Sequence, residues 1–169
     1  MAAATTRAAT VTRAAASATP QRSLVTNGGC AIVLPSGFQE ETPQGGYYPA
    51  LDQTGFAALD SFNTEGGQRS PETLAQAFAS GTLSQVIQGY RQTGVQQSGD
   101  GYRIDYVATV GGKPGRGSLY FKTFGTIACG ATLFTLDNSS LPFATTLDLM
   151  ILSLQVAPVS QPGTATPTR

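Results

Sequence analysis

The chain has 169 residues, zero formal net charge and only 12% charged residues, with two cysteines, no tryptophan and no histidine. This composition excludes imidazole-based catalysis and histidine-containing zinc sites, and it argues against nucleic-acid binding, which requires a basic surface. Hydrophobic residues make up 40% of the chain, which suffices for one folded domain, but no apolar run approaches the roughly 20 residues of a membrane-spanning helix.

Both ends of the chain have the composition of disordered tails. Residues 1–25 are rich in Ala, Thr and Arg, and the first carboxylate of the chain is Glu40. An acid-free stretch of this kind is typical of an organelle transit peptide, and also of a linker between a membrane anchor and a domain. Residues 157–169 are rich in Thr and Pro. Because the two tails are similar, we favour linkers, and we predict a single domain over residues 26–156.

The first half of this domain predicts three short strands and a broken helix. The strands cover residues 30–34, 47–51 and 55–62. Ser70 followed by Pro71 and Glu72 is a helix start, because serine caps free amides and proline is tolerated in the first turn. Two apolar stripes follow, out of phase with each other, so we expect a break at residues 80–81. The stripes are Leu74, Ala77 and Phe78, then Leu83, Val86, Ile87 and Tyr90.

The second half predicts an antiparallel meander and a closing helix. Alternation over residues 102–110 indicates the clearest strand, which a glycine-rich loop over residues 111–117 joins to a strand at 118–123. We expect residues 95–97 to form a strand that precedes residues 102–110 and pairs with them, and residues 131–136 to form the next strand after 118–123. An amphipathic helix over residues 143–154 ends the domain. The pattern predicts an α+β fold with helices covering a mainly antiparallel sheet.

These elements resemble the PsbP-like superfamily, which includes Mog-type nuclear-import factors and bacterial lipoproteins of the LpqN kind. The resemblance rests on residues 31–38, residues 70–74, residues 102–106 with the glycine-rich hairpin after them, and the closing amphipathic helix. It implies an α-β-α sandwich, for which we expect about six strands flanked by helices. It also implies a function that is mostly noncatalytic, and it transfers no functional residue to this chain.

The two cysteines have two interpretations. A disulfide between Cys30 and Cys129 would link the first predicted strand to the region before the strand at 131–136, and would close a long loop. Two buried free thiols are the alternative, since unpaired cysteines are commonly buried. The linker-like tails suggest export and favour the disulfide. We expect no metal or cofactor site.

Two other features are candidate binding residues. Leu149 and Leu152 lie outside the apolar stripe of the closing helix, where they either pack against further elements, which we favour, or form a partner surface. Lys113 and Arg116 lie in the glycine-rich loop, where two cations and free amides can hold an anion. A plain hairpin loop is the favoured interpretation of that segment.

We therefore predict a noncatalytic extracytoplasmic binding or accessory domain, membrane-tethered or secreted, that acts on a protein partner, a membrane complex or a small ligand. One alternative is an accessory subunit of a thylakoid or mitochondrial membrane complex, in an organelle lumen or matrix. The other is an enzyme that uses carboxylates, which we rank last because the acidic residues are dispersed.

Overall fold

The computed structural model describes residues 22–40, 45–64 and 69–158. Most of the two predicted tails, residues 1–21 and 159–169, lies outside the described residues. The boundary predicted at residue 26 is too late, because strand β1 already begins at Arg22 and runs to Asn27. Its side chains alternate between exposed and half-buried or buried positions, so its periodicity is that of a strand despite its polar start.

The centre of the molecule is a six-stranded antiparallel sheet with the order β3-β4-β8-β7-β6-β5. This confirms the predicted α+β class and the number of strands. The strands are β3 (Tyr47–Pro49), β4 (Gly55–Asn63), β5 (Gln88–Ser98), β6 (Gly101–Val110), β7 (Lys113–Phe124) and β8 (Ile127–Leu136). Several are longer than their apolar alternation indicates, because polar residues at strand ends still form ladder hydrogen bonds with the neighbouring strand.

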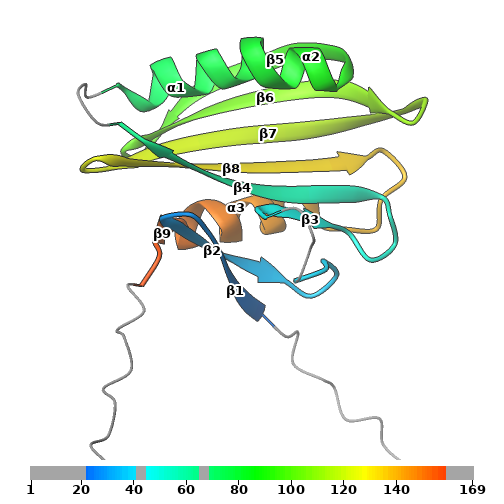
Figure 1. Cartoon of the computed structure of the whole chain (residues 1–169). Coiled ribbons are helices and arrows are strands. Elements are labelled where there is room, and N and C mark those ends of the chain that lie inside the picture. The colour runs from blue at the N-terminus through cyan, green and yellow to red at the C-terminus, as the bar shows by residue number, and fades with distance from the viewer. Residues whose placement is uncertain (1–21, 41–44, 65–68, 159–169) are drawn as a thin grey trace, which may run out of the picture.

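A broken helical segment covers the β5-β6-β7 side of one face of this sheet (Figure 1). It comprises α1 (Pro71–Phe78), a π-helical turn η1 (Ala79–Leu83) and α2 (Ser84–Val86). The predicted start is confirmed, since the Ser70 side chain accepts a hydrogen bond from the Thr73 amide. The predicted break is a π-helical turn rather than a cap and a new helix. The segment ends at Val86, so Tyr90 lies in β5 and not on a helix, which corrects that expectation.

The opposite face carries α3 (Phe143–Ser153) and a small antiparallel sheet of order β1-β2-β9 (Figure 1). Strand β2 spans Cys30–Pro35 and β9 spans Gln155–Val156. Val33 of β2 donates its amide to the Ser153 hydroxyl over 2.9 Å, which attaches the end of α3 to the edge of β2. The result is three layers, with the six-stranded sheet in the middle.

The predicted disulfide is confirmed. Cys30 of β2 and Cys129 of β8 are bonded, with their Cα atoms 5.7 Å apart, and both residues are fully buried. The bond joins β2 of the outer layer to β8, the third strand from the β3 edge of the six-stranded sheet, so it crosses the core on this side of the sheet. The two-free-thiol interpretation is therefore wrong.

Each face of the sheet has its own hydrophobic core. The α3 side buries the disulfide together with aliphatic residues such as Leu59, Leu133 and Met150. The α1 side buries a larger share of aromatic residues than the α3 side does, among them Tyr106 and Phe121. The two sets of side chains alternate along the same strands, because successive residues of a strand point to opposite faces.

Candidate functional site

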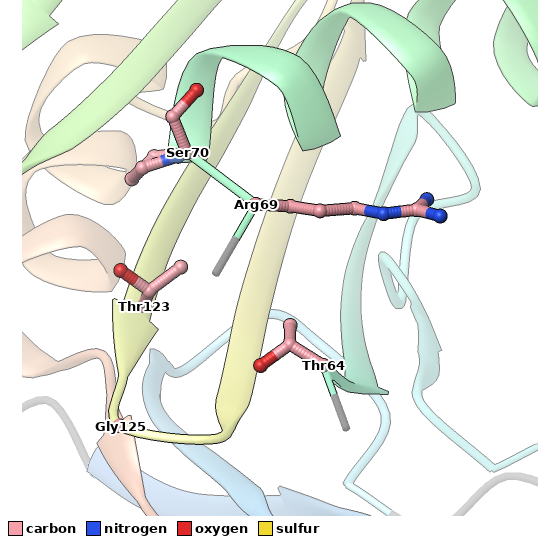
Figure 2. A pocket seen from close by; sticks show the side chains of 6 residues that line it. Thr64, Arg69, Ser70, Thr123 and Gly125 are labelled. Carbon is pink, nitrogen blue, oxygen red and sulfur yellow. The ribbon is translucent and has the colours of Figure 1, made fainter. Parts of the chain in front are cut away.

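Three segments that are distant in sequence converge at one end of the six-stranded sheet: the end of β4, the start of α1 and the β7–β8 turn. The Thr64 amide donates to the Thr126 carbonyl over 2.8 Å, and the Thr64 hydroxyl donates to the same oxygen over 2.9 Å. These bonds hold β4 against the turn. Between the three segments lies a cavity of about 360 Å³ (Figure 2). It is lined by Thr64, Arg69, Ser70, Pro71, Thr123 and Gly125.

Arg69 lines this polar cavity and also a second, aromatic cavity. Its side chain extends below α1 toward β4 (Figure 2), and it also lines a cavity of about 220 Å³ between these elements. Three phenylalanine rings line that cavity, with centroids 5.6 to 6.1 Å apart: Phe62, Phe78 and Phe121. We call the two cavities together the Arg69 site.

The Arg69 guanidinium has no ion-pair partner among the residues that the structure describes. The two ion pairs in these ranges are Arg103 with Asp105, at an N–O distance of 2.7 Å, and Lys122 with Asp100, at 2.9 Å. A cation bordered by hydroxyls on one side and by rings on the other can hold an anion that carries an apolar group. No group of three or more His, Cys, Asp and Glu side chains suited to a metal occurs in the described part of the chain.

One carboxylate lies near this site on the same face of the sheet. Asp60 precedes Phe62 by two residues on β4, so the two side chains point to the same side. Burial raises the pKa of Asp60 from 3.8 to about 6, because a charged carboxylate is poorly solvated there. Asp60 does not line either cavity of the Arg69 site.

The two leucines predicted outside the stripe of the closing helix have different environments. Leu152 is 86% exposed, so nothing in the described part of the chain packs on it and the packing interpretation is wrong for this residue. Leu149 is half-buried and lines a mostly apolar cavity of about 300 Å³ between the start of α3 and the ends of β1 and β2. The same cavity is lined by Arg22 and Thr146, among others, and the buried Thr146 hydroxyl has no hydrogen-bond partner within the part of the chain that the structure describes.

The segment after β6 is a plain hairpin turn, as the favoured interpretation expected, and the anion-binding alternative does not form. The loop is only Gly111 and Gly112, and both cations lie in strand β7. Lys113 and Arg116 are three residues apart in that strand, so they point to opposite faces and do not converge. The Arg116 guanidinium lies 5.1 Å from the centre of the Phe143 ring, where it makes a cation–π contact with the start of α3.

The Arg69 site itself is absent from the residues predicted as candidates. Arg69 immediately precedes the Ser70 cap, and nothing in its neighbours marks it as a binding residue. Apart from Ser70, its hydroxyl neighbours come from distant segments, which the pairing of β8 with both β4 and β7 brings beside it.

No model of a known protein family matches the chain, and no curated protein matches it in sequence. Solved structures do match it in three dimensions. Cyanobacterial PsbP (CyanoP) from Synechocystis sp. PCC 6803 aligns with a TM-score of 0.55 at 11% identity, over 87% of this chain and 99% of that one. The Ran-binding protein Mog1p of Saccharomyces cerevisiae aligns with a TM-score of 0.55 at 12% identity, over 82% of this chain and 96% of that one.

A third match is LpqN of Mycobacterium tuberculosis, a protein involved in cell envelope biogenesis. It has a TM-score of 0.52 at 13% identity, over 82% of this chain and 91% of that one. The chain has the PsbP-like fold. At these identities the likeness concerns the fold, and it transfers no ligand or partner. Within the described ranges, no helix of this PsbP-like domain is long and apolar enough to span a membrane.

Proposed function

We propose that this chain is a noncatalytic extracytoplasmic binding or accessory domain of PsbP-like type, which docks on a protein partner through the outer side of α3. The observation that carries the proposal is the exposure of Leu152, 86% of whose surface is open to water, on the same helix as the apolar cavity lined by Leu149. An exposed leucine beside an apolar cavity is typical of a surface that a partner covers.

The partner in this proposal is a protein that inserts an apolar side chain into the cavity and covers Leu152. The cavity offers mainly hydrophobic wall, with residues such as Leu141 and Pro142 opposite Pro35. Burial of apolar surface is the main favourable term in such contacts. Mog1p, which shares the fold, is itself described as a Ran-binding protein, so this fold is compatible with protein recognition.

The disulfide supports an extracytoplasmic location. Disulfides persist in oxidising compartments and are rare where thiols are kept reduced. Lysis of intact cells directly into denaturant that contains an alkylating reagent, followed by mass spectrometry, tests this point, because unfolding makes the buried sulfurs accessible. We expect Cys30 and Cys129 to remain unmodified until a reductant is added, and alkylation of both without reductant would contradict the location.

Capture of partners from native membranes tests the docking surface. We expect Leu152→Gln to retain the wild-type free energy of unfolding within about 0.5 kcal/mol, because the side chain is solvated, and to lose a stoichiometric partner. Leu51→Gln is the matched control, since Leu51 is 64% exposed in the turn between β3 and β4. Equal capture by all three proteins would contradict docking through α3.

A further inference from the structure

We infer that the Arg69 site binds a small monoanionic amphiphile, whose carboxylate-type head pairs with Arg69 and whose apolar tail lies against the three phenylalanines. This site is on the α1 side of the six-stranded sheet and the proposed docking surface is on the α3 side, so the two assignments are independent.

The head group follows from the charge and hydroxyls of the polar cavity. Arg69 is the one cationic residue among the described residues that line either cavity, so it matches one negative charge rather than a polyphosphate. Ser70 and Thr123 add hydroxyls, and the Thr123 hydroxyl makes no hydrogen bond with another described residue. The carboxylates of Asp60 and Glu72 line neither cavity, and no acidic residue occurs among the described residues that line them.

The apolar tail of the proposed ligand is inferred from the walls of the second cavity. Phe62 and Phe78 are only half-buried, although each packs against the fully buried Phe121 ring. Leu74 and Ala77 of α1 complete an apolar wall beside these rings. Transfer of an aliphatic chain from water to such a wall is favourable by about 0.8 kcal/mol for each buried methylene.

Arg69, which lines both cavities, specifies the class of ligand. Its side chain extends from the polar cavity beneath α1 toward β4 (Figure 2), so a head group bound by its guanidinium can place its tail in the aromatic cavity. Together the cavities fall in the size range of small-molecule sites. A molecule with only a head or only a tail would use one half of the site.

Titration with octanoate, followed by amide chemical shifts in nuclear magnetic resonance spectra of the full chain, tests this inference. We expect saturable shifts at the amides of Thr64, Thr123 and Gly125. Octanol has the tail without the charge, and acetate has the charge without the tail. Both are expected to bind at least about tenfold more weakly than octanoate.

Three variants complete the experiment. Arg69→Gln is expected to weaken octanoate binding about tenfold, and Ala77→Glu to weaken it by at least as much, since it places a carboxylate in the apolar wall. Both positions are exposed, so the fold should persist, which the unaffected amides report. Arg91→Gln, at an exposed position of β5, should bind as the wild type does.

Several results would overturn the inference. They are the absence of saturable shifts with octanoate at millimolar concentration, equal affinity for octanol, unchanged binding by Arg69→Gln, and shifts confined to the cavity beside Leu149. The last would assign octanoate to the α3 side instead.

Discussion

The two faces of the six-stranded sheet differ in how their buried tyrosine hydroxyls are hydrogen-bonded. On the α3 side, Tyr48 donates to the Thr26 carbonyl over 3.3 Å and Tyr120 donates to the Ser98 carbonyl over 3.0 Å. On the α1 side, the hydroxyls of Tyr90, Tyr106 and Thr132 have no hydrogen-bond partner among the described residues.

The two faces also differ in covalent cross-linking. The α3 side is closed by the disulfide between β2 and β8, whereas noncovalent packing alone holds α1 and η1 on the other side. The α1 side also carries the two cavities that Arg69 lines. One face is therefore closed by a covalent bond, and the other has the two cavities of the Arg69 site and, outside them, buried hydroxyls without a partner among the described residues. The unpaired Thr146 hydroxyl is an exception on the α3 side, and it lies at the cavity beside Leu149.

Removal of the disulfide should have the largest effect. The bond closes a loop with a sequence separation of 99 residues, so replacement of Cys30 and Cys129 by serine should lower the free energy of unfolding by about 4 to 5 kcal/mol. Urea denaturation of the variant, and of the wild type with and without reductant, measures this. A loss below about 1 kcal/mol would show that the α3 layer stays in place without the bond, and would remove the main contrast between the faces.

A methyl group at Gly117 tests how tightly the aromatic core of the α1 side is packed. A Cβ atom there would lie 2.2 Å from Cζ of Tyr106, whose ring is buried between Tyr90 and Phe134. We expect Gly117→Ala to cost about 2 to 3 kcal/mol, because the ring cannot move freely. Gly81→Ala is the control: its Cβ would meet nothing within 4 Å, so thermal unfolding should show equal or greater stability. Equal stability of both variants would indicate a loosely packed core.

The pH dependence of stability reports the half-buried carboxylate of Asp60. Because its pKa is raised to about 6 in the folded state, folding favours the protonated form. The contribution of Asp60 to the free energy of unfolding is therefore greatest below about pH 4, falls as the pH rises from about 4 to 6, and is constant above that. Asp60→Asn should stabilise the protein by about 1 to 3 kcal/mol at neutral pH and hardly at all near pH 4.

Urea denaturation at the two pH values measures the difference. Asp148→Asn, at an exposed position of α3, provides the control and should change stability by less than about 0.5 kcal/mol at either pH. An Asp60→Asn variant that is less stable than the wild type at neutral pH would mean that the ionised carboxylate has a favourable partner.

The smallest effects come from the tyrosine hydroxyls, and they test the comparison most directly. Tyr120→Phe should cost about 1 kcal/mol, because the Ser98 carbonyl loses its donor. Tyr106→Phe should be neutral or stabilising by up to about 1 kcal/mol, because its hydroxyl is buried without a partner. Equal losses in chemical denaturation would show that the Tyr106 hydroxyl is satisfied, and that the two faces do not differ in this respect.

Much of the architecture follows from local patterns. Alternation over residues 102–110 predicts β6, and Ser70 with Pro71 predicts the start of α1; the structure has both. Local pattern fails at Tyr90, where helical spacing continues past Val86 although the chain becomes extended at Ile87. Pairing with β6 decides that segment, because backbone hydrogen bonds along a strand can override a weak helical periodicity.

The candidate sites depend more on long-range pairing than the elements do. The residue types and their spacing do not decide whether the two cysteines form a disulfide or stay as free thiols, because no local pattern shows which strands lie over one another. The structure places β2 over β8 and so decides the pairing. In the same way, helical spacing identifies Leu149 and Leu152 as lying outside the core stripe, but only the neighbours of α3 show that one lines a cavity and the other faces water.

The sequence by itself determined the α+β class, the antiparallel meander, the capped start of the broken helix and the absence of imidazole chemistry. These follow from residue types and from spacings of a few residues, which local sterics and periodicity control. The tertiary structure alone decided the disulfide, the strand order and the Arg69 site. Each of these joins residues that are far apart in the chain, and their proximity depends on the register and packing of the whole sheet.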